Sequence, residues 1–156
     1  MDWGTLAGTT LGAVLGVRTL LGERSRWRRE NTSHERAAKQ QLYGEYLAAL
    51  WLTRHGLREL KRSIGLSREE RIQQAGEILG SANAFQLLYQ IHIMAPEPLG
   101  DVADQTFLRL RHLRDRFDEP DVSADPEWSA TQGALGEALE ALRRAMRSDL
   151  KSSPVW

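Results

Sequence analysis

The sequence predicts an all-α protein, in which an N-terminal apolar helix precedes a roughly four-helix antiparallel bundle. Apolar residues recur with a helical period along most of the chain, and alternating strand patterns are missing. Only the first stretch, residues 3–22, is apolar on all sides with a single charge. The 156 residues suit one domain that is large enough to bury its own core.

The first element, residues 3–22, is predicted to be a transmembrane helix. It reads WGTLAGTTLGAVLGVRTLLG, and as a helix it is ~30 Å long, close to the thickness of a hydrocarbon core. Asp2 replaces the basic start of a secretory signal, and no small-residue cleavage site follows. Because Arg18 and several glycines make insertion marginal, the alternative of a buried helix in a soluble protein stays open.

Four glycines recur at every fourth position of this span, at Gly4, Gly8, Gly12 and Gly16. Each glycine inside a water-exposed helix costs about 1 kcal/mol relative to alanine. In lipid, such a stripe allows two helix backbones to approach closely. The stripe therefore predicts oligomerisation of the chain through a glycine zipper, with packing inside one chain as the alternative.

A basic segment, residues 23–36, follows the span. The predicted ligands of anionic lipid headgroups are Arg18, Arg24, Arg26, Trp27, Arg28 and Arg29. Basic residues next to a span remain in the cytoplasm, so the bundle is predicted there and the N-terminus outside a bacterial cytoplasmic membrane. Nucleic acid is the less favoured partner, because 21 basic residues balance 21 acidic ones.

Three stretches of the first third carry a resemblance: DWGTLAG at the start, Arg-Trp-Arg-Arg after the span, and QLYGEY at residues 41–46. They resemble small, uncharacterised, N-terminally membrane-anchored helical proteins of high-GC actinobacteria. The resemblance implies an N-terminal anchor, and it brings no activity and no functional residues.

The bundle is predicted over residues 37–151. Its first helix either starts anew at Thr32, where Glu35 completes a capping box, or continues out of the membrane. Its stripe ends before Gly65. The stripe consists of Leu42, Tyr46, Leu50, Leu57, Leu60 and Ile64.

Three more helices are predicted after Gly65. The first starts at a capping box of Ser67 and Glu70 and ends before Pro96. Its stripe consists of Ile72, Ala75, Leu79, Ala82, Phe85, Leu88 and Ile91. The second runs from about Gly100 to Phe117. Its stripe consists of Val102, Thr106, Leu110, Leu113 and Phe117.

An acidic linker over residues 118–125 leads to the last helix, which Asp125 caps and Pro126 opens. The stripe of this helix consists of Trp128, Leu135, Leu139, Leu142, Met146 and Leu150. Residues 152–156 are predicted to form a loose tail.

No catalytic residue, metal site or cofactor is predicted. The chain has no cysteine, and no glutamate stands three residues before His34, His55, His92 or His112, as a di-metal bundle needs. Asp121, Ser123 and Asp125 copy the start of a calcium loop, but proline replaces its glycine. Asn83 and Gln86 lie near an apolar face, either as buried hydrogen-bonding residues or as edge positions.

The leading hypothesis is a non-enzymatic, membrane-tethered interaction or scaffold protein. It would bind anionic lipid, self-associate through the zipper and offer the bundle to an unidentified protein partner. One alternative is a small pore-forming or membrane-active protein, with Arg18 lining a narrow lumen. The other is a soluble helical-bundle regulator, in which residues 3–22 are a core helix.

Overall fold

A computed structural model describes the backbone of residues 9–152 and the side chains of residues 30–152. The chain divides into two units, of which one spans Ala38–Ser153, and this unit is the bundle. The elements, in chain order, are α1 (Thr9–Arg62), α2 (Arg68–Ser81), α3 (Ala84–Met94), α4 (Glu97–Asp115), the short 3-10 helix η1 (Arg116–Asp118) and α5 (Trp128–Ser152).

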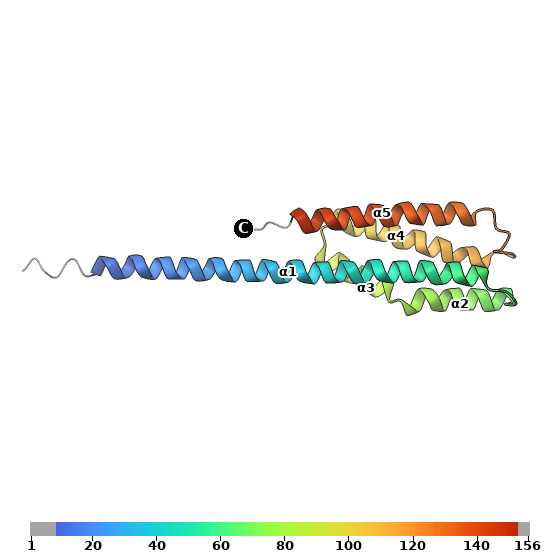
Figure 1. The fold of residues 1–156 in the computed structure, drawn as a ribbon, viewed down its shortest axis with the longest axis horizontal. Helices are drawn as coiled ribbons and strands as arrows, with labels where there is room; N and C mark the ends of the chain where they lie inside the picture. Colours follow the sequence, from blue (N-terminus) through green and yellow to red (C-terminus); the bar gives the residue numbers. More distant parts are fainter. Residues whose placement is uncertain (1–8, 153–156) are drawn as a thin grey trace, which may run out of the picture. The chain divides into compact units, whose positions relative to one another are not determined.

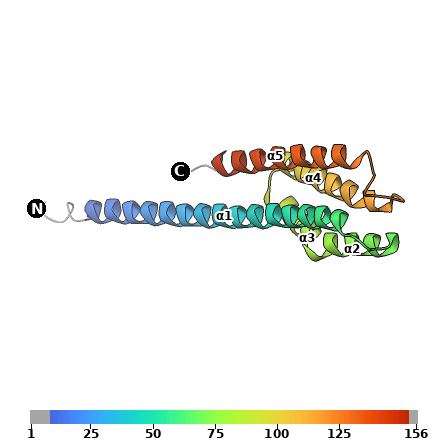
Figure 2. The ribbon, with the colours of Figure 1, turned by 45° about the vertical axis from the view of Figure 1, so that its right-hand side comes forward.

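The bundle has four helical positions: the C-terminal half of α1, the consecutive helices α2 and α3, then α4, then α5 (Figures 1 and 2). At one end the Tyr43 hydroxyl of α1 donates a hydrogen bond to Asp149 of α5, 2.7 Å away. At the other end the Lys61 ammonium of α1 lies 5.1 Å from the ring centroid of Trp128 of α5. These two contacts show that α1 and α5 run antiparallel.

The predicted apolar stripes meet in one core. Phe117 and Trp128 close it at the η1 end, with their rings edge to face at 5.5 Å and 86°. The fully or almost fully buried residues include Leu42, Tyr46, Leu50, Leu57, Leu60, Ala75, Leu88, Ile91, Leu110, Leu113, Leu135, Leu142 and Met146. The prediction of an all-α fold with four helices packed in a bundle is therefore confirmed.

The first bundle helix does not start anew at Thr32. Helix α1 continues through residues 31–35 without a break, so the helix start predicted from the capping box at Thr32 is wrong. The helix ends at Arg62, three residues before Gly65, where its end was predicted, and Gly65 adopts a left-handed conformation with φ 86°. Ile64 lies beyond the helix end and is 97% exposed, so its assignment to the core stripe is wrong.

The single helix predicted between Ser67 and Pro96 is two helices. The capping box of Ser67 and Glu70 opens α2 as predicted. The chain then breaks at Asn83, whose φ of 54° is left-handed and ends the helical path. The break changes the phase of the apolar stripe, so that Ala84 and not Phe85 faces the core.

Two further boundaries differ from the prediction. Helix α4 begins at Glu97, three residues before Gly100, and Pro98 fits its first turn because the N–H groups there need no helical partner. Helix α5 begins at Trp128, after a turn at Pro126. Ser152, predicted to begin the loose tail, is instead the last residue of α5, and residues 153–156 lie outside the described residues.

Candidate interaction surface

Helix α3 exposes a ridge of large apolar side chains. Phe85 is 70% exposed, Tyr89 67% and Ile93 70%, and their spacing of four residues places them on one helix face. We call these three residues the α3 ridge. The helix reads AFQLLYQIHIM and carries no Asp, Glu, Lys or Arg. A water-facing surface of this kind typically marks an interaction site.

The opposite face of α3 fixes the direction of the ridge. Ala84, Leu88 and Ile91 are buried in the core and leave the ridge on the outside. On the flank toward α4, the ring of Phe85 lies 6.0 Å from the ring of Phe107, centroid to centroid. The ridge is therefore a consequence of core packing on the other side of the same helix.

A second contact clamps the C-terminal part of α3 to α4. His92 Nε2 lies 2.9 Å from Asp104 Oδ1. The ring of His92 also packs on Gly100, where a Cβ atom would lie 2.9 Å from His92 Nδ1. A side chain at position 100 would displace the ring, so Gly100 and Asp104 together fix the place of the His92 ring on α4.

An open groove of about 450 Å³ lies beside the ridge, at the break between α2 and α3. Leu79, Phe85 and Phe107 give it apolar walls, and Gly76 leaves room along α2. Arg111 of α4 is the cationic residue of its lining. The groove enlarges the apolar surface toward the start of α3.

Helix α1 exposes a smaller apolar site at Trp51, which is 58% exposed. Its indole stacks on the ring of His55, with centroids 5.3 Å apart and an interplanar angle of 1°. Leu52, next in the chain, is also 58% exposed. The His55 ring covers part of the indole, so this site offers less free apolar surface than the α3 ridge.

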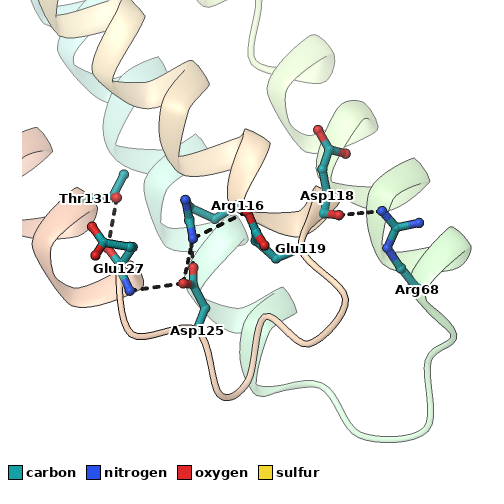
Figure 3. A network of polar contacts seen from close by, with 7 residues as sticks. All are labelled: Arg68, Arg116, Asp118, Glu119, Asp125, Glu127 and Thr131. Carbon is teal, nitrogen blue, oxygen red and sulfur yellow. Dashed lines mark hydrogen bonds and ion pairs between the residues drawn. The ribbon is translucent and has the colours of Figure 1, made fainter.

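A polar network closes the loop between η1 and α5 (Figure 3). The Arg116 guanidinium donates two hydrogen bonds to Asp125, Nε to Oδ2 at 2.7 Å and Nη2 to Oδ1 at 2.6 Å, and these hold the pKa of Asp125 below its usual value. The Glu127 N–H donates to Asp125 Oδ1 at 3.0 Å. Arg68 of α2 donates to the Asp118 carbonyl. The predicted cap residue Asp125 therefore orders the loop as well as the approach to α5.

A second polar cluster ties the other end of the bundle. Lys39 Nζ lies 3.2 Å from Asp149 Oδ2, and both side chains are only 11% exposed. The same carboxylate oxygen accepts the hydrogen bond from Tyr43. Burial, and then the hydrogen bond to Asp149, raise the pKa of Tyr43. This cluster is structural, since it joins α1 to the C-terminal end of α5.

The predicted site residues precede the described side chains. Gly4 and Gly8 lie outside the described residues altogether. The others lie on α1, where the structure describes the backbone alone: Gly12, Gly16, Arg18, Arg24, Arg26, Trp27, Arg28 and Arg29. Within residues 9–152, no helix is long and apolar enough to cross a membrane.

The side chains named for their chemistry do not converge. Residues 30–152 hold no group of three His, Asp, Glu or Cys side chains placed to bind a metal ion. His34 and His112 are exposed, on α1 and α4. Asn83 and Gln86 are exposed too, so they are edge positions and not buried hydrogen-bonding residues.

Sequence reasoning missed the α3 ridge. It placed Phe85 in the core and did not single out Tyr89 or Ile93. A signal was present, because residues 84–94 form a mostly apolar helix with no Asp, Glu, Lys or Arg, and a helix without a charged face is normally covered. In a chain with few helices to cover it, such a helix indicates an interaction surface.

No protein-family model matches the chain, and no curated protein and no solved structure was found to match it.

Proposed function

We propose that the chain is a non-enzymatic, membrane-tethered interaction protein whose helical bundle binds a protein partner through the α3 ridge. The single observation that carries the proposal is the ridge itself, three large apolar side chains exposed on an uncharged helix. The tether is the apolar segment of residues 3–22 with its basic flank, and the glycine stripe gathers copies of the chain.

The composition of the ridge fits a protein interface. The cores of protein interfaces are depleted in charge and enriched in aromatic residues. Phe85 and Tyr89 provide two aromatic anchors, and Gln86 and Gln90 provide a polar edge. Complete burial of a side chain of this size contributes roughly 1.5–3 kcal/mol. A partner that covers the ridge would remove these side chains from water, and this burial would stabilise the complex.

Site-specific photocross-linking tests the docking surface in the full chain in living cells. A photoreactive phenylalanine analogue replaces Tyr89, and in a matched variant it replaces Ser148, which is exposed on α5. We expect discrete protein adducts from position 89 and none from position 148. Equal adduct patterns at the two positions, or none at position 89, would refute docking through the α3 ridge.

An alkaline carbonate wash tests the tether separately. We expect the full chain to stay with the membrane fraction, and a variant without residues 3–22 to be released. Release of the full chain would remove the tether from the proposal and favour the soluble regulator. The cross-linking result would still stand, since it concerns the bundle alone.

A further inference from the structure

We infer that the partner of the α3 ridge is the α3 ridge of a second copy of this chain, with the two Tyr89 side chains facing each other at a two-fold axis. The inference rests on the proposed function, because it names the occupant of the surface proposed there. It adds a contact between bundles to the self-association predicted for the glycine zipper.

The charge pattern favours a second copy. The same surface patch of each copy meets in a two-fold pair, so a patch with charges of one sign would bring like charges together. Helix α3 has no Asp, Glu, Lys or Arg, and Asp104 of α4 is paired with His92. Arg111 of α4 lines the groove next to Phe85, at the start of α3 and away from Tyr89. The exposed Gln86 and Gln90 carry amides that both donate and accept hydrogen bonds. The surface is therefore compatible with itself.

The spacing of the ridge gives the same answer. Residues at i, i+4 and i+8 form one of the side-chain rows with which helices interlock, and two helices that interdigitate such rows cross with an angle of about −50° between their axes. Phe85 and Ile93 lie four residues on either side of Tyr89. In a symmetric pair, an apolar residue then meets an apolar residue along the whole row, and Tyr89 is at the crossing point.

The size of the surface explains why the tether matters. Eleven residues make a helix of about 16 Å, which covers less than the roughly 800 Å² per partner of a standard stable interface. Pairing through α3 alone is therefore weak. Copies held together by their N-terminal segments meet at a high effective concentration, which turns a weak contact into a populated one.

Disulfide trapping tests the pair, and the absence of cysteine makes it clean. Tyr89→Cys is introduced into the full chain, reconstituted in lipid vesicles, and compared with Ser148→Cys under the same mild oxidation. We expect the position-89 dimer to form roughly tenfold faster or more, since pairing raises the effective concentration of one thiol at the other. Equal rates at the two positions would overturn the inference.

A charge exchange removes chance collision as an explanation. Phe85→Arg with Ile93→Arg, added to Tyr89→Cys, should abolish the fast cross-link, and Phe85→Glu with Ile93→Glu should do the same. A mixture of the two variants should recover it as a mixed dimer. Positions 85 and 93 are both exposed, so we expect these variants to fold normally. Thermal melts that match the parent protein check this. Failure to recover the cross-link in the mixture would overturn self-pairing.

The outcomes separate this inference from the proposed function. Photocross-links from position 89 to a different protein, together with slow disulfide formation, would overturn the second copy and leave the docking surface intact. Absence of both cross-links would overturn the two together.

Discussion

At the scale of single residues, Asn83 decides where α2 ends and how α3 is turned. Its φ of 54° lies in the left-handed region, where asparagine is tolerated and most residues are strained. Its side chain is exposed and makes no capping hydrogen bond. The conformation of the backbone, and not a side-chain contact, is therefore what position 83 contributes.

Replacement of Asn83 should reveal this preference. Asn83→Ala should be less stable than Asn83→Gly by about 1 kcal/mol, because glycine alone enters the left-handed region without steric cost. Urea unfolding of both variants checks the difference. If alanine were as stable as glycine, the break at Asn83 would not be a left-handed turn in solution.

Tyr43 should make the stability of the bundle depend on pH, because burial and the hydrogen bond to Asp149 raise its pKa. Above the ordinary tyrosine value of about 10, the unfolded chain loses a proton that the folded chain keeps. The contribution of Tyr43 to the free energy of unfolding is therefore fully present below pH about 10, and it is lost as the pH rises toward the higher pKa of the folded state. Tyr43→Phe removes this group, so the alkaline loss of stability should become shallower. Urea unfolding between about pH 8 and 11 measures both slopes, and equal slopes would contradict the role of Tyr43.

At the scale of helices, two isoleucines of α3 provide a matched pair. Ile91 is 0% exposed and Ile93 is 70% exposed, two residues further on. Ile91→Ala should cost about 2–5 kcal/mol, whereas Ile93→Ala should change stability by no more than about 0.5 kcal/mol. Chemical denaturation of the two variants tests the orientation of the α3 ridge. Equal losses would mean that both faces of α3 are buried.

Two glycines of α1 form another pair. No atom lies within 4 Å of a Cβ built at Gly44, but a Cβ at Gly56 would lie 2.9 Å from Ile78 Cγ2. Gly44→Ala should therefore stabilise the helix by about 0.5–1 kcal/mol. Gly56→Ala should be net destabilising, since overpacking costs about 1–3 kcal/mol. Thermal melts of both variants measure the signs, and a stabilising Gly56→Ala would show that α1 and α2 pack more loosely.

The sequence predicted helices better than their breaks. Periodic stripes identified the bundle helices, and the capping box at Ser67 and the turn at Gly65 were located by local chemistry. The break at Asn83 has no proline or glycine at its centre, and asparagine fits a helix as well as a left-handed turn. Its position depends on how α2 and α3 pack on the rest of the bundle, which local sequence does not encode.

At the scale of the whole molecule, the candidate surface depends on the tertiary fold. A period of 3.6 residues identifies a stripe, but when both faces of α3 are apolar it does not say which one the bundle covers. Burial of Ala84, Leu88 and Ile91 shows which face is covered, and contacts between α3 and α4, such as Phe85 with Phe107 and His92 with Asp104, accompany that orientation. These pairs are distant enough in sequence that no spacing rule connects them.

The bundle should fold without the segment that precedes it. Residues 30–38 are all exposed, and the core of the described part lies between Leu42 and Met146. A fragment of residues 38–152 should therefore fold alone, with a helical circular dichroism spectrum and a cooperative melt. A molten or aggregated fragment would show that the N-terminal segment belongs to the core, as the soluble alternative requires.

The same fragment separates folding from association. Because α3 alone offers a small interface, the fragment should sediment as a monomer at micromolar concentration, even though its fold is complete. The full chain in vesicles should instead show the cross-link at position 89, since the tether supplies the effective concentration. A stable dimer of the fragment would show that the bundle associates without the N-terminal segment, which would contradict this prediction.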